Sequence, residues 1–144
     1  MGEELIKIGD KEYPIDAKEL YLSEMNISSL DWLEKFKNIE RLWLDHNKIS
    51  EIDHLSHLTN LIGLRLGNNR ITEIKNLDNL KKLRWLYLNN NRITKIENLD
   101  KLESLENLYI DDNPLKSIDK KTFDFLRVRG TIFCSLSGKK YGTV

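Results

Sequence analysis

Apolar residues recur along the chain with a period of 22 residues. The stretch 61–82 (LIGLRLGNNRITEIKNLDNLKK) reads L-x-x-L-x-L-x-x-N-x-I-x-x-I-x-x-L-x-x-L-x-x, and the same pattern returns at 39–60 and 83–104. Self-similarity at a fixed period of about 20–50 residues indicates stacked structural repeats. Extending the pattern in both directions gives five units, which start at Ala17, Ile39, Leu61, Leu83 and Leu105.

The first part of each unit predicts a short strand. Two apolar columns are separated by one polar or aromatic residue, the alternation that is typical of a strand. The columns hold Leu20, Leu42, Leu64, Leu86 and Leu108, and then Leu22, Leu44, Leu66, Leu88 and Ile110. We expect these strands to stack in parallel about 4.8 Å apart and to form one curved sheet.

The second part of each unit has apolar residues at every third position, as in Ile49, Ile52, Leu55 and Leu58. An α-helix would rotate such a row away from one face, whereas a 3₁₀ turn keeps it aligned. The convex side is therefore expected to be mostly 3₁₀ or extended. The predicted fold class is an α/β-type repeat solenoid, right-handed and curved, with a parallel concave sheet.

A column of asparagines follows the strands, and Met25 takes its place in the first unit. An amide has two donors and an acceptor, so it can satisfy buried backbone groups at a tight bend. We expect a hydrogen-bonded ladder between turns. Its members are Asn47, Asn69, Asn91 and Asn113.

The two ends of the repeat array predict caps, because a solenoid otherwise exposes apolar ends. Two short strand-like stretches surround Gly9-Asp10, which predicts an N-terminal hairpin. The tail alternates loosely and then turns at Ser137-Gly138, which predicts a C-terminal hairpin. The predicted divisions are an N-terminal cap at 1–16, five repeats at 17–126 and a C-terminal cap at 127–144.

This pattern resembles leucine-rich repeats, in particular the short class found in a regulatory subunit of protein phosphatase 1 and in bacterial internalins. The resemblance covers residues 17–126. It implies a module that binds or regulates another protein. In the fifth unit, Lys121 and Asp124 replace apolar residues. The position of Phe123 makes this unit resemble a longer class of leucine-rich repeat.

The outward residues of the strands are the candidate binding surface, since alternation points them away from the core. Tyr, Trp and Arg recur there, and these residue types are enriched at binding hot spots. The candidate partner-binding residues are Tyr21, Arg41, Trp43, Asp45, Arg65, Trp85, Tyr87, Asn89, Tyr109 and Asp111.

Arg65 lies at the centre of this surface between Gly63 and Gly67. We expect a depression around its guanidinium, rimmed by rings from the neighbouring strands. Such a site suits an acidic or C-terminal group beside an apolar anchor. The alternative is that the rings only pack on one another and that the glycine relieves crowding next to Trp85.

A row of cations, Lys48, Arg70 and Arg92, follows the ladder asparagines by one residue. Together with Tyr/Trp stacking, it gives a second function hypothesis, the binding of nucleic acid or phosphoinositide. Glu51 and Glu73 are expected to neutralise the row. The chain has 23 Lys+Arg and 23 Asp+Glu, so it lacks the basic field that favours nucleic acid.

Other features narrow the class of protein. Cys134 is the only cysteine, which excludes an internal disulfide and favours a reducing compartment. The N-terminus, MGEELIKIGD, is acidic where a secretory signal is basic and then apolar. No apolar run approaches the ~18 residues of a membrane span. We therefore expect a cytoplasmic protein without a membrane span.

Neither a catalytic motif nor a metal-ligand pattern stands out. His46, His54 and His57 do not match a recognised ligand spacing, and nucleophile elbows and phosphate loops are missing. We expect no enzyme activity, no metal, no cofactor and no small-molecule substrate. The favoured hypothesis is a monomeric protein-interaction module that acts as an adaptor or regulator. A third hypothesis, self-association through an uncapped end, is disfavoured by the predicted caps.

Overall fold

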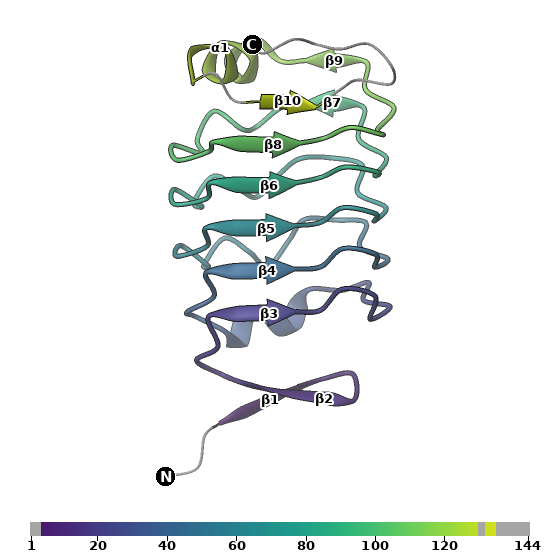
Figure 1. Cartoon of the computed structure of the whole chain (residues 1–144), viewed down its shortest axis with the longest axis vertical. Helices are drawn as coiled ribbons and strands as arrows, with labels where there is room; N and C mark the ends of the chain where they lie inside the picture. Colours follow the sequence, from purple (N-terminus) through teal and green to yellow (C-terminus); the bar gives the residue numbers. More distant parts are fainter. Residues whose placement is uncertain (1–3, 130–131, 135–144) are drawn as a thin grey trace.

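The computed structural model describes residues 4–129 and 132–134. The chain winds into a stack of turns, and each turn adds one strand to a parallel sheet (Figure 1). The order in this sheet is β10-β8-β6-β5-β4-β3. Its strands are β3 (Glu19–Tyr21), β4 (Arg41–Trp43), β5 (Gly63–Arg65), β6 (Trp85–Tyr87), β8 (Asn107–Tyr109) and β10 (Ile132–Cys134).

The register of the sheet follows the repeat period. Leu42 lies opposite Leu20 on one side and Leu64 on the other, so each column of the sequence becomes a row across the sheet. The middle residue of every repeat strand is fully buried, while its two neighbours lie on the outward, concave face. Burying one leucine contributes about 1.5–3 kcal/mol, and the five-fold repetition therefore determines which face is inside.

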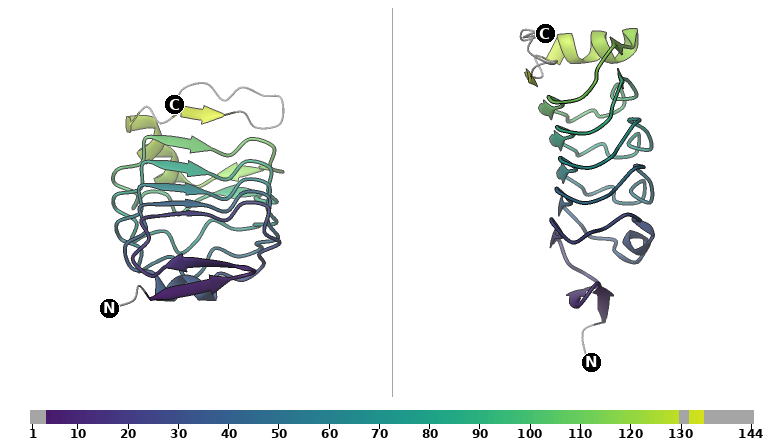
Figure 2. Two further views of the ribbon diagram at one scale, coloured as in Figure 1. Left: turned by 60° about the horizontal axis from the view of Figure 1, so that its bottom comes forward. Right: turned by 90° about the vertical axis from the view of Figure 1, so that its right-hand side faces the viewer.

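The convex side of the repeats is mostly turns and extended segments (Figure 2), as the threefold spacing predicts. The first repeat carries a 3₁₀ helix, η1 (Asp31–Lys35). Two short strands, β7 (Lys95–Ile96) and β9 (Ser117–Ile118), pair in parallel. The convex apolar residues, such as Ile52 and Leu55, are fully buried and join the leucine columns in one core cluster.

The fifth repeat differs from this expectation because it contains an α-helix, α1 (Lys120–Arg129). Asp119 caps the helix: its Oδ1 accepts the backbone N–H groups of Lys121 at 3.0 Å and Thr122 at 3.3 Å. Thr122 and Leu126 are the buried residues of α1, and their spacing of four is that of a helix face. The local cap and the lost threefold row explain why this repeat alone forms a full helix.

The end of the array before β3 carries an antiparallel hairpin of β1 (Leu5–Ile8) and β2 (Lys11–Pro14). Its turn includes Gly9 at φ +60°, a conformation that glycine adopts without steric cost. At the other end, β10 pairs in parallel with β8. The hairpin expected around Ser137-Gly138 lies outside the described residues.

Candidate functional site

Asparagine amides hold the turn after each strand. Asn69 Oδ1 accepts the backbone N–H of Ile49 at 3.0 Å, and Asn69 Nδ2 donates to the carbonyls of Leu44 at 2.9 Å and Leu66 at 3.1 Å. Equivalent bonds are made by Asn47, Asn91 and Asn113. Because a buried, unpaired backbone group costs about 1–3 kcal/mol, this ladder keeps successive strands in register.

Two columns of left-handed backbone were not predicted from the sequence. One precedes the ladder and comprises Glu24, His46, Asn68, Asn90 and Asp112, with φ between 52° and 60°. The other lies on the convex side and comprises His54, Asn76 and Asn98, with φ between 53° and 61°. Asn is among the residues that tolerate this conformation best; its recurrence at 68 and 90, and at 76 and 98, was the available signal.

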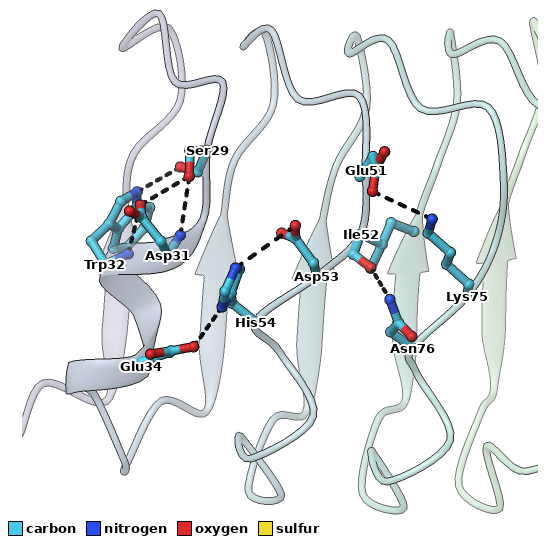
Figure 3. A network of polar contacts seen from close by, with 10 residues as sticks. All are labelled: Ser29, Asp31, Trp32, Glu34, Glu51, Ile52, Asp53, His54, Lys75 and Asn76. Carbon is cyan, nitrogen blue, oxygen red and sulfur yellow. Dashed lines mark hydrogen bonds and ion pairs between the residues drawn. The ribbon is translucent and has the colours of Figure 1, made fainter.

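The convex column forms a second set of links between turns (Figure 3). Asn76 Nδ2 donates to the carbonyl of Ile52 at 2.7 Å. His54 occupies the same column one turn earlier, and its Nδ1 lies 2.7 Å from Glu34 Oε1. This hydrogen bond raises the pKa of His54. The side chains on this face are therefore used for contacts between turns.

The concave face carries two stacked pairs of rings. Tyr21 and Trp43 have centroids 4.3 Å apart and an interplanar angle of 18°. Tyr87 and Tyr109 also have centroids 4.3 Å apart, at 9°. The Arg65 guanidinium lies between the pairs, 4.9 Å from the centroid of the Tyr87 ring. The five residues thus occupy one row across the sheet, since their strands pair in that register.

A hollow of about 270 Å³ lies at the centre of this face. A Cβ added at Gly63 would meet Trp85 Cε3 at 3.6 Å and Arg41 Cγ at 3.8 Å, which are ordinary contact distances. Relief of crowding therefore does not explain the glycine. Its missing side chain instead opens the hollow, which is lined by Arg41, Leu42, Trp43, Gly63, Arg65, Trp85 and Tyr87.

Gly67 has a different role from Gly63. A Cβ here would come within 2.7 Å of Asn89 Oδ1 and 3.0 Å of Asp45 Oδ1, so a side chain at this position would force the Asn89 amide and the Asp45 carboxylate to shift. The Gly67 N–H donates to Asp45 Oδ1 at 3.1 Å. Asp45 is buried, and its Oδ2 lies 2.8 Å from Arg65 Nε. Asp45 therefore holds the central arginine in place.

The arginines of the concave face are paired with carboxylates of this chain. Arg65 binds Asp45, and Arg41 forms an ion pair with Glu19. Tyr21 Oη also donates to Glu19 at 2.8 Å. The hydrogen bonds from Tyr21 and then Arg41 lower the pKa of Glu19, and the bond to Glu19 raises the pKa of Tyr21.

A further pair at the rim was missed by the sequence reasoning. Arg84 Nε and Nη2 both donate to the Glu106 carboxylate at 2.9 Å, and the Arg84 guanidinium lies 5.0 Å from the centroid of a Trp85 ring. The bond to Glu106 raises the pKa of Arg84. Opposite charges one period apart, as at 19/41 and 84/106, were the sequence signal that was available for these pairs.

The ten predicted residues divide into three groups by position. Five of them line the hollow, namely Arg41, Trp43, Arg65, Trp85 and Tyr87. Asp45 binds Arg65 without lining the hollow, and Tyr21 and Tyr109 extend the rings on either side. Asn89 and Asp111 are half-buried near the strand ends and do not line it.

The histidines take surface or structural positions. His46 is exposed, and His57 Nε2 lies 2.9 Å from the Phe36 carbonyl on the convex side. Within residues 4–129 and 132–134, the structure shows no group of three His, Cys, Asp or Glu side chains placed to hold a metal ion. In the same ranges, every helix is too short or too polar to cross a bilayer.

Parallel strands stacked one per turn, with bonded turns and an open outer face, define a solenoid repeat protein. A family model described as leucine rich repeats (2 copies) matches residues 18–57 and 81–124. These two segments make up more than half of the chain. The chain belongs to the leucine-rich repeat family.

Solved structures with the same fold include internalins of Listeria monocytogenes. Internalin C2 of Listeria monocytogenes is 35% identical, with a TM-score of 0.63 over 66% of this chain and 42% of that one. A leucine-rich repeat protein of Leptospira interrogans is 28% identical, with a TM-score of 0.65 over 76% of this chain and 29% of that one.

A further internalin of Listeria monocytogenes is 23% identical, with a TM-score of 0.64 over 74% of this chain and 31% of that one. This chain therefore spans less than half the length of each of these three structures. A comparison with curated protein sequences finds no significant match.

Proposed function

We propose that this chain is a non-catalytic module that binds another protein on its concave face, as a cytoplasmic, monomeric adaptor or regulator. The observation that carries the proposal is the hollow at Gly63, walled by Trp43, Trp85 and Arg65. Rings and guanidinium groups around a central pocket are the composition of binding hot spots. Membership of the leucine-rich repeat family supports protein binding as the general class of function.

The shape of the hollow suits one flat side chain of the partner. Arg41 and Trp85 flank Gly63 from the two adjacent strands, so their backbones are about 9.6 Å apart. This separation admits a single ring or branched aliphatic group between the Arg41 stem and the Trp85 ring. The partner is therefore expected to insert an aromatic or aliphatic anchor.

We expect Arg65 to bind the polar group of the partner. Its ion pair with Asp45 uses Nε, and its Nη groups form no ion pair with another described residue. An acidic or C-terminal carboxylate next to the anchor can accept hydrogen bonds from them. Because Asp45 already holds the guanidinium, binding does not have to order this side chain, and less entropy is lost.

The competing hypothesis of phosphate binding on the concave face receives less support. Arg41, Arg65 and Arg84 are each paired with a carboxylate. Because these charges are already balanced, the face lacks the excess of positive charge that phosphate backbones require, whereas an apolar anchor does not depend on charge. The rings and the hollow thus favour a protein side chain over a nucleic acid or a phosphoinositide.

A steric block tests the proposal. Gly63→Leu fills the hollow without removing any contact, and Trp43→Ala removes one wall. In affinity capture from a lysate of the source organism, each change is expected to weaken partner binding by at least about 2 kcal/mol, roughly 30-fold. The affinity for the captured partner is then measured by calorimetry with the purified proteins.

The matched control is Asn38→Leu, which adds the same side chain at an exposed position between η1 and β4. It should bind the partner as the unchanged chain does. Equal capture by the unchanged chain, Gly63→Leu and Trp43→Ala, all shown to be folded by circular dichroism, would rule out the concave hollow as the binding site.

A further inference from the structure

A row of exposed cations runs along one edge of the solenoid, outside the concave hollow. Lys48, Arg70 and Arg92 are exposed and each follows a ladder asparagine. Their backbone N–H groups donate at 2.8 Å to carbonyls of the preceding turn, on residues 27, 49 and 71 respectively. The three segments therefore run side by side in register, and the three side chains leave the same edge.

These three cations form no ion pair with a carboxylate of the described residues. The predicted neutralisation by Glu51 and Glu73 is wrong, because both carboxylates lie beside Lys75 Nζ, at 3.4 Å and 3.7 Å. The arginines of the concave face and its rim, by contrast, are all ion-paired. The edge is thus the place in the repeats where stacked positive charge is left without a counter-charge.

Hydroxyl groups widen this row. Ser50, Thr72 and Thr94 are exposed and stand two residues after the cations, with a buried isoleucine between each cation and its hydroxyl. In an extended segment, residues two apart point to the same side. Each turn therefore presents one cation and one hydroxyl outward. We call these six residues the cationic strip: Lys48, Ser50, Arg70, Thr72, Arg92 and Thr94.

The fold does not need the positive charges of the strip. Its side chains are exposed, and like charges one strand spacing apart repel each other. A bound anion would remove this repulsion. Guanidinium groups bind carboxylates through two parallel N–H···O bonds, and the hydroxyls can donate further hydrogen bonds to the same anion.

We propose that the cationic strip binds an acidic, Asp/Glu-rich segment of a protein in extended conformation. The strip is one cation wide, and its outer members are two strand spacings, about 10 Å, apart. An extended segment of about four residues covers this length. The site is separate from the concave hollow, and the proposal does not depend on the function proposed there.

Two other kinds of anionic partner fit the strip less well. Single-stranded nucleic acid is usually held by a basic groove together with aromatic rings that stack on the bases, and the strip contains no ring. Binding to an anionic membrane gains strength from apolar side chains that enter the interface, and the strip presents none. Both are included as competing ligands in the test.

The test uses a fluorescein-labelled peptide of alternating Glu and Ser, capped at both ends, in fluorescence anisotropy at about 20 mM salt, where charges are weakly screened. The strip variant carries Lys48→Ala, Arg70→Ala and Arg92→Ala. The control variant carries Lys7→Ala, Lys11→Ala and Lys37→Ala, three exposed lysines elsewhere. Both variants lower the net charge by three, so a difference between them does not come from the overall charge.

The strip variant is expected to lose at least about 10-fold in peptide affinity and the control less than about 2-fold, and binding should weaken as salt rises. Gly63→Leu should bind the peptide unchanged, so a failure of the concave site does not affect this result. An equal loss in both variants, or no peptide binding at all, overturns the proposal. So does binding of oligo-deoxythymidine or of phosphatidylserine vesicles in place of the peptide.

Discussion

The two faces of the main sheet differ in how strictly they repeat. On the inner face, the middle residue of each repeat strand is a leucine, and each is fully buried. On the concave face, the residue after it is Tyr, Trp, Arg, Tyr or Tyr, and its exposure varies. The same backbone positions both sets, but only one set packs in the core.

This difference separates residues that maintain the fold from residues free to vary with function. A change on the inner face leaves a cavity in close-packed surroundings, so repetition is required there. A change on the concave face mainly alters contacts with solvent or a partner. The glycines illustrate the contrast: a Cβ at Gly67 would displace the side chains of Asn89 and Asp45, whereas Gly63 has room for a Cβ and opens the hollow instead.

Adjacent residues of β4 give the most direct test of the comparison. Leu42→Ala is expected to lower the free energy of unfolding by about 3 kcal/mol, because it leaves a cavity in the core. Trp43→Ala should cost only about 1 kcal/mol, through its lost stacking on Tyr21. Urea denaturation measures both, and equal losses would show that the concave ring is a structural residue.

The asparagine ladder consists of polar residues that the fold requires as strictly as the buried leucines. Asn69→Ala removes the partner of the Ile49 N–H and of three carbonyls, so we expect a loss of about 2–3 kcal/mol in unfolding free energy. Asn79→Ala, at an exposed convex position, should change it by less than about 0.5 kcal/mol. A similar, small effect of both changes would contradict the role of the ladder.

The turn before the ladder offers a change that stabilises the chain. Glu24 has φ of 60°, a conformation that costs a non-glycine residue roughly 1 kcal/mol. Glu24→Gly should therefore raise the unfolding free energy by about 1 kcal/mol. Ser23→Gly in the same turn, where φ is not left-handed, should give no gain. A loss with Glu24→Gly would mean that its side chain contributes more than the backbone strain.

The smallest expected effect is a change in the pKa of Glu19 on the concave face. The hydrogen bond from Tyr21 lowers the pKa of Glu19, so Tyr21→Phe should raise that pKa toward its ordinary value. A carboxyl whose pKa is lowered by folding stabilises the protein above its unfolded-state pKa, and this contribution is lost as the pH falls through the folded-state pKa. Carboxyl NMR titration measures the change, and Tyr87→Phe, which leaves the bond intact, should not reproduce it.

The sequence was most informative about the features that the repeat period alone determines. The spacing of Leu20, Leu42 and Leu64 predicted the register of the strands, and the pairing agrees. The threefold row predicted a convex side that is mostly not helical. The helix α1 was missed although its signals are local, a capping Asp119 and an apolar-facing pair four residues apart, because the repeat pattern was extended into the fifth unit.

The candidate site was predicted only in part, because pairing between turns depends on side-chain conformation. The sequence placed Arg65 among rings, and the structure adds that Asp45 holds it and that Glu19 pairs with Arg41. For the edge, the sequence suggested that Glu51 and Glu73 neutralise the cations. The structure places both carboxylates beside Lys75 instead.

By itself, the sequence determined the period, the buried columns and the outward row of Tyr, Trp and Arg, because a one-residue slip would move every leucine out of the core. Only the tertiary structure decided which charges meet, which glycine opens a hollow and which cations stay unpaired. Those outcomes depend on distances between neighbouring turns, and one-dimensional spacing does not specify the direction in which a long side chain points.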